Sequence, residues 1–282
     1  MKSIFINVKR KIKDLNIYTP FAENVIKDNL VYKGTFYLYV VCKILGVFIS
    51  YYLWKAIFLS SNREVLGGFT RQEMITYIFM SFVCSNMVYI SITTKIGNDV
   101  VDGSIAINLI KPINYKLKLL SESIGEMAYK FIVPSLFIWF GLELYRVGSM
   151  GLSVTALKNV IAFLVSSLFS FILYFLFEFC FGMLAFYSTY VWGMEIIKNS
   201  ILSFLTGQLI PLTFFPDMIQ KIFDFMPFAS MNYVPVMIYM GKISGIELIY
   251  SIGIQGLWIL ILELLSCVLW KKIIRRISVL GG

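Results

Sequence analysis

The chain has 282 residues, of which 59% are hydrophobic and 17% are aromatic, and its mean hydropathy is +0.79. Too few polar side chains remain to cover a soluble globule of this length, so the composition predicts a protein of the lipid bilayer. The formal net charge of +9 is interpreted as a determinant of membrane topology, and we expect no nucleic-acid partner. Histidine is absent, which excludes histidine-dependent general bases, catalytic triads and zinc motifs.

The first segment, residues 1–33, is basic and amphipathic. Its apolar residues recur at roughly helical spacing, which is typical of a helix lying at the membrane interface. A cleavable signal peptide is the competing interpretation, but the first apolar run begins only near Gly34 and is longer than a signal core of ~7 to 15 residues. The apolar positions are Ile4, Phe5, Val8, Ile12 and Leu15, and the basic ones are Lys9, Arg10, Lys11 and Lys13.

The remainder of the chain predicts a single all-α integral membrane domain over residues 1–282. A spanning helix needs ~20 mostly apolar residues, and six stretches meet this requirement. Lysine and arginine are more frequent on the side that holds the N-terminus, which places both termini in the cytoplasm. The four cysteines fall inside these stretches without metal-ligand spacing, so we expect no metal or cofactor site. The six predicted spans are 34–59, 72–94, 118–145, 157–187, 196–214 and 246–271.

A polar stretch at residues 95–116 separates the second and third predicted spans. Gly103 can adopt the left-handed conformation that ends a short helix, and Pro112 forces the preceding residue out of helical conformation. These two breaks predict a small rigid elbow, which we expect to face a soluble partner. Its candidate contact residues are Asp99, Asp102, Gly103, Ile105, Leu109 and Pro112.

Among the charged residues within predicted spans, Lys43, Glu178 and Glu263 are singled out because they are placed centrally. A charge at the bilayer centre costs roughly 2.5 to 3.5 kcal/mol on insertion scales, so each calls for an explanation. Their similar predicted depth would allow them to pair with one another. Either Lys43 snorkels and the acids bond between helices, or the three line a translocation path, and the sequence leaves both interpretations open.

Residues 211–245 are apolar but interrupted by prolines, so they are too broken to span the membrane. The prolines predict that the fifth span ends near Pro211. We expect a re-entrant pair of short helices at the outer face, because non-helical backbone at membrane depth must be shielded from lipid. An amphipathic surface loop is the alternative. The residues expected to form an outer gate are Pro211, Phe215, Pro216, Pro227 and Phe228.

Together, these features resemble the permease subunit of a prokaryotic type-2 ATP-binding-cassette (ABC) exporter. The most specific residues lie in the elbow sequence GSIAINLIKP, where Gly103, Ile105, Leu109 and Pro112 match the family's glycine, apolar, leucine and proline pattern. Asp102 departs from the pattern, because many relatives have a basic residue there. The resemblance implies that the elbow is a coupling helix docking on a separate ATPase, with two permeases forming the pathway as a homodimer or a heterodimer.

The resemblance also implies a multi-pass protein of the bacterial cell membrane. The chain contains neither a phosphate loop nor a dinucleotide fingerprint, so ATP and its magnesium ion are expected on the partner ATPase. A secondary transporter using the intramembrane Glu and Lys residues is one rival hypothesis. A membrane-embedded lipid-modifying enzyme is the other. Nothing in the resemblance fixes the cargo.

Overall fold

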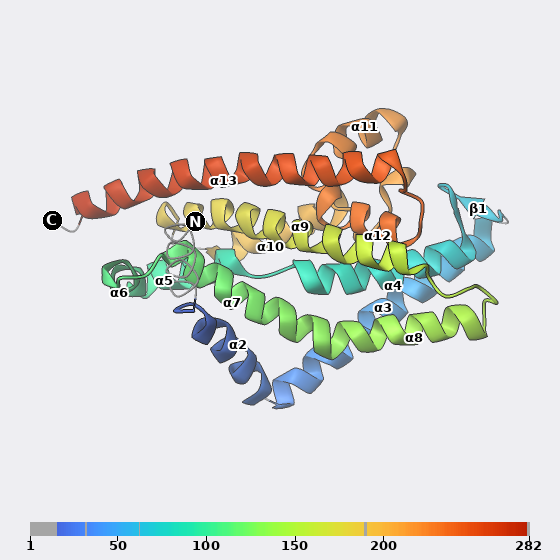
Figure 1. The fold of residues 1–282 in the computed structure, drawn as a ribbon, viewed down its shortest axis with the longest axis horizontal. Helices are drawn as coiled ribbons and strands as arrows, with labels where there is room; N and C mark the ends of the chain where they lie inside the picture. Colours follow the sequence, from blue (N-terminus) through green and yellow to red (C-terminus); the bar gives the residue numbers. More distant parts are fainter. Residues whose placement is uncertain (1–15, 32, 62, 189–190, 281–282) are drawn as a thin grey trace, which may run out of the picture.

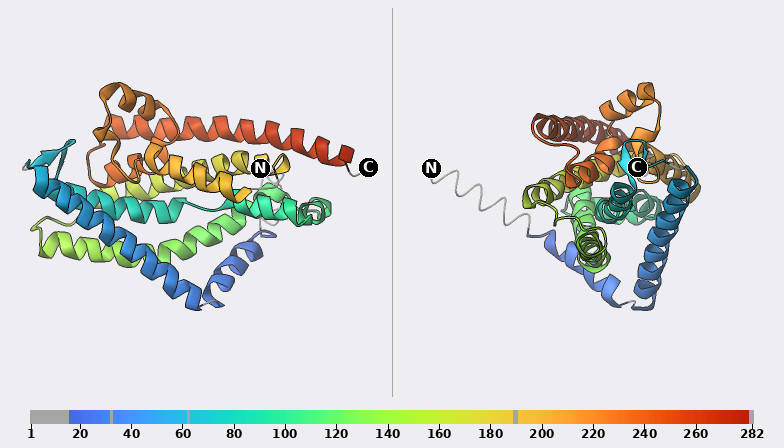
Figure 2. Two further views of the ribbon diagram at one scale, coloured as in Figure 1. Left: turned by 180° about the vertical axis from the view of Figure 1, so that it is seen from behind. Right: turned by 90° about the vertical axis from the view of Figure 1, so that its right-hand side faces the viewer.

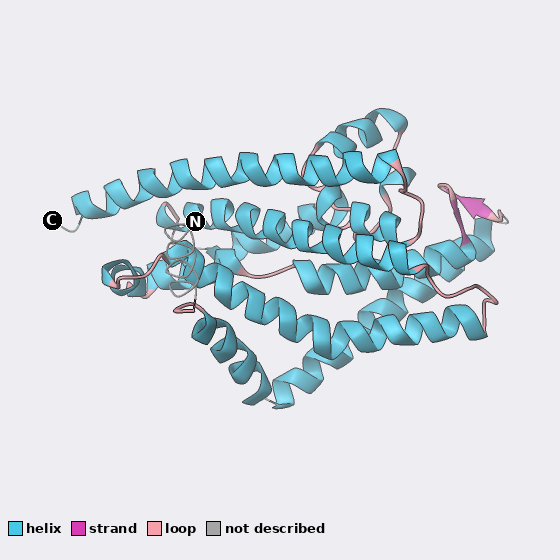
Figure 3. Ribbon diagram, viewed as in Figure 1, coloured by secondary structure: helices cyan, strands magenta, loops and turns pink. Residues whose placement is uncertain are grey.

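A computed structural model describes residues 16–31, 33–61, 63–188 and 191–280. It is almost wholly helical, apart from one short antiparallel hairpin (Figure 3). In chain order the elements are α2 (Thr19–Val31), α3 (Lys33–Ser61), β1 (Val65–Leu66), β2 (Phe69–Thr70), α4 (Arg71–Val88), α5 (Ile92–Val101), α6 (Ser104–Ile110), α7 (Tyr115–Lys130), η1 (Phe131–Ser135), α8 (Leu136–Gly148), α9 (Leu157–Gly182), η2 (Met183–Phe186), α10 (Val191–Leu205), η3 (Leu212–Phe214), α11 (Asp217–Phe225), η4 (Ala229–Met231), α12 (Tyr233–Tyr239) and α13 (Ile246–Leu280).

The long helices run roughly side by side along one axis of an elongated bundle (Figure 1). Helices α5 and α6 lie at the same end of the bundle as the C-terminal end of α13. The β1–β2 hairpin lies at the opposite end, and a view from behind shows the same arrangement (Figure 2). The elbow and the hairpin between the first two spans are therefore at opposite ends of the molecule, as expected if each span crosses a bilayer.

Five helical stretches within the described residues are long and apolar enough to span a membrane. They are Tyr37–Ser61, Arg71–Val101, Tyr115–Gly148, Leu157–Phe186 and Ile246–Arg275.

The fifth predicted span, residues 196–214, is not found as such. Helix α10 has 15 residues, which corresponds to about 22 Å of rise, shorter than a ~30 Å hydrocarbon core. It ends at Leu205, well before Pro211, and Gly207 follows in the left-handed conformation with φ 73°. The predicted helix end near Pro211 is therefore wrong, because the glycine turn stops the helix earlier than the proline would.

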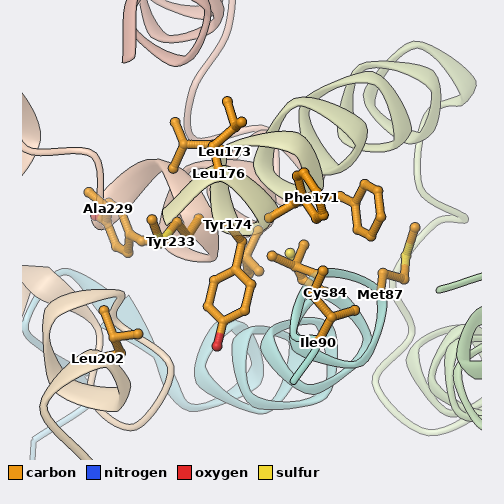
Figure 4. Close-up of a cluster of buried hydrophobic side chains, with 14 of the residues drawn as sticks. Cys84, Met87, Ile90, Phe171, Leu173, Tyr174, Leu176, Leu202, Ala229 and Tyr233 are labelled. Atoms are coloured by element: carbon orange, nitrogen blue, oxygen red, sulfur yellow. The ribbon is translucent and has the colours of Figure 1, made fainter. Parts of the chain in front are cut away.

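The core is built around α4, α9 and α12, whereas α3 lies at the edge. In the stretch Arg71–Val101, 78% of the most apolar part is buried inside the protein, against 11% in Tyr37–Ser61 of α3. Figure 4 shows Cys84 and Met87 of α4, with Ile90 just after its end, facing Phe171 and Tyr174 of α9. Since α3 exposes most of its apolar side chains, that helix is suited to contact lipid or another membrane subunit.

The predicted interfacial helix is described only from residue 16 onward, and its apolar and basic positions up to Leu15 lie outside the described residues. Within the described part, α2 packs closely against α7. A Cβ atom built on Gly125 would lie 2.4 Å from the backbone oxygen of Ala22, so only glycine permits this approach. The Ser121 hydroxyl also donates to the Tyr18 carbonyl at 2.5 Å. The segment before the first span is thereby fixed to the third.

Candidate functional site

The second span is interrupted between α4 and α5. Val88 ends α4 and Ile92 begins α5, so the backbone from Tyr89 to Ser91 is not helical. A helix break leaves carbonyl groups without partners on one side and amide groups on the other. Lys130 donates to the Tyr89 carbonyl at 2.9 Å, which places a cation at the C-terminal end of α4, where the helix dipole favours it.

On the other side of the break, at the start of α5, a carboxylate accepts hydrogen bonds. Glu178 of α9 accepts from the Thr93 backbone amide at 3.1 Å and from the Thr93 hydroxyl at 2.7 Å, near the N-terminus of α5. Lys198 of α10 forms an ion pair with this carboxylate and donates to the Thr93 hydroxyl at 3.2 Å. Glu178 is fully buried and Lys198 is 5% exposed. Three helices therefore meet at one buried, hydrogen-bonded charge pair.

The pairing that similar depth would allow among Lys43, Glu178 and Glu263 is not found. Glu263 of α13 binds Lys116 of α7 at 2.6 Å. Lys43 has no carboxylate of a described residue within 4 Å, and its Nζ lies 5.4 Å from the centre of the Tyr39 ring. A similar depth in the membrane does not bring Lys43 close to the two acids, because α3, which carries Lys43, packs mainly on α4 and not on α9 or α13.

A second charge network joins α5 to α7. Lys95 lies 3.9 Å from Glu122 and 3.4 Å from Glu126. Lys118 and Lys130 extend the network along α7, at 3.7 Å from Glu122 and 2.8 Å from Glu126. All five side chains are largely covered, so these links fix the direction in which α5 leaves the bundle.

The elbow itself is held by Asp99. Gly103 has a φ of 71°, the left-handed conformation that the sequence predicted, and it separates α5 from α6. The Asp99 carboxylate accepts from the Ser104 hydroxyl at 2.8 Å, the Asn108 amide at 3.2 Å and the Tyr115 hydroxyl at 2.7 Å. Asp99 thus bonds within the elbow, whereas Asp102 is exposed. The two aspartates expected to act as polar neighbours have different surroundings.

The apolar face that the elbow exposes differs from the predicted one. Ile105 is only 7% exposed and belongs to the core, and Leu109 packs partly against it. On the opposite side of α6, Ile107 is 57% exposed and Ile110 is 83% exposed. The expectation that Ile105 presents itself to a soluble partner is therefore wrong, because the turn at Gly103 rotates that side of α6 toward the bundle.

Pro112 ends the elbow in the expected manner. The preceding residue, Lys111, is extended with ψ 143°, so the helix cannot continue through it. The side chain of Asn114 then accepts from the Leu117 amide at 3.1 Å and caps α7. The elbow is therefore bounded by defined helix stops on both sides.

The outer segment is divided between a surface helix and a buried one. No residue of α11 is buried, whereas α12 is almost fully covered and packs on α9 and α4. The structure thus combines features of the two interpretations left open, a surface helix and a shielded one. Among the expected gate residues, Pro211 and Pro227 are buried and Pro216 is exposed.

The two gate phenylalanines contact different partners. Phe215 packs edge-to-face on Phe223 of α11 at 5.5 Å, and Phe228 packs on Phe177 of α9 at 5.8 Å. Close to these rings, burial and the neighbouring carboxylate of Glu247 raise the pKa of Asp224 above its ordinary value. The segment is therefore anchored to the bundle by Phe228, while α11 keeps only peripheral contacts through Phe223 and Phe225.

Sequence reasoning missed Lys198 and Lys116 as the ion-pair partners of Glu178 and Glu263, and Thr93 as a hydrogen-bond partner of the first pair. One signal was available, since Lys198 falls within an apolar stretch predicted to span the membrane. A charge there requires a partner just as Glu178 does. Within the described residues, no group of three or more His, Cys, Asp or Glu side chains is placed to hold a metal ion.

Comparison with known proteins adds the deciding observation. A family model described as ABC-2 family transporter protein matches residues 44–281, which is most of the chain. The chain belongs to this family. It is a multi-pass membrane protein and a permease of an ABC transporter, a class of transport subunit that works with ATPase subunits. A search of curated proteins found no match.

Proposed function

We propose that this ABC-2 permease is the membrane subunit of an ATP-driven exporter and couples to a separate ATPase through the elbow at residues 95–116. Transport occurs along a pathway formed with a second permease copy or a paralogue, and ATP and magnesium bind to the ATPase. The family assignment favours this function over a secondary transporter or a lipid-modifying enzyme.

The observation that carries the proposal is the exposed apolar face of α6. Ile107 and Ile110 stand free at the end of the bundle, on a helix whose backbone is fixed by Gly103 and Asp99. Exposed isoleucines on a rigid element are suited to bind a partner, because little conformational entropy is lost on binding. They replace Ile105 as the expected contact residues, and Leu109 packs against the core of the bundle.

The elbow is also joined to the membrane core by charge. Helix α5 begins at the Glu178–Lys198 pair and ends at the elbow, so a displacement of α9 or α10 is transmitted along α5 to α6. This is the mechanical link that coupling requires: an element with a docking face at one end and charged contacts to two helices, α9 and α10, at the other.

The proposal is tested by purifying the tagged chain from native membranes and identifying an ABC ATPase that accompanies it. An Ile107→Asp, Ile110→Asp variant should lose the ATPase, since removal of a central apolar contact costs at least about 2 kcal/mol, or about 30-fold in Kd. The matched Ile107→Leu, Ile110→Leu variant should retain it. Normal ATPase recovery and transport by the aspartate variant would remove the elbow from the docking surface.

A further inference from the structure

Two cavities lie end to end beside α3, and they differ in chemistry. The first, of about 480 Å³, is lined mostly by apolar and aromatic side chains, among them Val47, Trp54 and Phe82. The second, of about 320 Å³, is lined mostly by polar and charged side chains. Lys43 and Gln208 line both cavities, so the two are neighbours that share a wall. Both volumes fall within the range of small-molecule sites.

The polar cavity contains a hydrogen-bond donor without a partner. Asn86 is 4% exposed, and its carbonyl oxygen accepts from the Tyr39 hydroxyl at 3.1 Å. Its amide nitrogen Nδ2 has no hydrogen-bond partner among the described residues. Because an unsatisfied buried donor costs free energy, this nitrogen marks a place where a ligand acceptor would be bound.

Two opposite charges in the same cavity also lack ion-pair partners. Lys43 has no carboxylate within 4 Å, and Glu195 has no basic nitrogen within 4 Å, among the residues that the structure describes. They do not pair with each other. Lys130, the other cation in the cavity, is already bound to Glu126 and the Tyr89 carbonyl. The cavity thus offers one cation and one anion that lack an ion-pair partner among the described residues, although Glu195 also has a side-chain hydrogen bond with Asn199.

The polar cavity is also placed at the break in the second span. Tyr89, Ile90 and Ser91, the non-helical residues, all line it. Interrupted spanning helices provide backbone groups that can face a bound ligand, which is tolerated where the backbone lines a cavity and not where it meets lipid. The non-helical backbone at the break therefore lines a cavity inside the protein.

We propose that these cavities bind one amphiphile, with a zwitterionic headgroup in the polar cavity and its acyl chain in the apolar one. An anionic group such as a phosphate accepts from Lys43 and the Asn86 amide, and an ammonium group lies against Glu195. The chain extends along α3 toward Trp54. This inference names a substrate class for the proposed exporter, so its biological meaning rests on that function.

The order of the two cavities agrees with the predicted topology. Lys43 lies nearer to the N-terminal end of α3 and Trp54 nearer to its opposite end, next to the hairpin. With the N-terminus in the cytoplasm, the headgroup site is on the cytoplasmic side of the acyl-chain site. A lipid of the inner leaflet has the same orientation, so it enters without inverting.

The test measures binding to the purified chain, in the assembly in which it purifies, held in phosphatidylglycerol nanodiscs. Three probes share a chain of equal length: lauroyl lysophosphatidylethanolamine, lauroyl lysophosphatidic acid and dodecylammonium. The first carries both charges, the second only the anion and the third only the cation. We expect saturable binding of all three, with the zwitterion bound about tenfold more tightly than either single-charge probe.

The variants should give a crossed pattern. Lys43→Met should weaken binding of the zwitterionic and the anionic probe about tenfold, since one charge-assisted hydrogen bond is lost. Binding of the cationic probe should be unchanged. Glu195→Gln should weaken binding of the zwitterionic and the cationic probe and leave binding of the anionic probe unchanged. Lys43→Arg should restore binding. Lys55→Met is the matched control, because Lys55 also lies over a tyrosine ring on α3 but lines neither cavity.

A separate variant addresses the apolar cavity. Gly46 lines it, and an added Cβ atom there meets nothing within 4 Å, so Gly46→Phe fills space without a backbone clash. It should weaken lauroyl probes about tenfold and leave hexanoyl analogues unchanged. Gly34→Phe, on the same helix and equally free of contacts, should weaken neither.

Three outcomes would overturn the inference. They are the absence of saturable binding, equal effects of Lys43→Met and Lys55→Met, and a change of oligomeric state in place of binding, which would mean that a second copy covers the cavity. ATPase recovery, measured on the same preparations, reports on the proposed function separately. A chain that retains its ATPase but binds no probe would refute only the amphiphile.

Discussion

At the scale of single residues, charges inside the bundle are neutralised by partners that come from distant parts of the sequence. Glu178 and Lys198 are both buried, and Thr93 bonds to each of them. A buried ion pair gains little over an apolar pair, because desolvation opposes the attraction, but one partner without the other leaves an uncompensated charge. The pair therefore fixes the arrangement of α5, α9 and α10 more than it adds stability.

We expect Glu178→Leu and Lys198→Leu each to lower the free energy of unfolding by about 3 to 5 kcal/mol, because each leaves the other charge buried and unpaired. The double variant should be more stable than either single one. Denaturant unfolding of the purified protein in detergent measures this as a double-mutant cycle. Losses that simply add in the double variant would mean that the two side chains do not interact.

At the scale of elements, the left-handed turn at Gly103 determines which side of α6 is exposed. Its Cβ position is free of contacts, so a side chain there is opposed by the backbone conformation and not by crowding. A non-glycine residue in this conformation costs about 1 to 2 kcal/mol, and a β-branched residue is the least tolerant. Relief of this strain would rotate α6 and displace its isoleucines.

Gly103→Val should therefore reduce ATPase recovery and the coupling of ATP hydrolysis to transport, while membrane insertion is unchanged. Gly151→Val is a matched control, because Gly151 also has a positive φ, of 65°, and open space around its Cβ position, but lies outside the elbow. The measurement is ATPase activity and transport in reconstituted vesicles. Equal effects of the two variants would attribute the change to general backbone strain.

At the scale of the whole molecule, the elbow and the β1–β2 hairpin lie at opposite ends of the bundle (Figure 1). The lysine and arginine distribution predicts that the elbow end is cytoplasmic. Five spans lie within the described residues. If both termini are cytoplasmic, the chain must cross the membrane once more, and α10 with the outer segment is the part left to do so. The side of the membrane on which the residues next to α12 are exposed therefore decides between the possible topologies.

This arrangement is checked by single-cysteine labelling with the four native cysteines replaced by alanine. Ala106→Cys, on the exposed side of α6, should react with an impermeant thiol reagent only after the membrane is opened. Ser244→Cys, in the exposed turn before α13, should react in intact cells. If both cysteines react from the same side, then α10 and the outer segment do not cross the membrane as proposed.

The sequence by itself determined the membrane class, the position of most spans and the two stops of the elbow. These follow from local properties: apolar length for the spans, the absent Cβ of Gly103 and the ring of Pro112. The resemblance of the sequence to type-2 ABC permeases also indicated the family to which the chain belongs. Local chemistry acts in the same way wherever the chain packs, which is why these predictions needed no partner helix.

Only the tertiary structure decided which charges meet and which apolar residues are exposed. Lys198 pairs with Glu178, Lys116 pairs with Glu263, and Lys43 pairs with neither acid, because helix packing sets lateral neighbours that depth along a span cannot define. Likewise, both sides of α6 are apolar in sequence, and the bundle buries one of them. Contacts between distant segments depend on how helices are rotated and placed, and that information is held by the whole packed assembly.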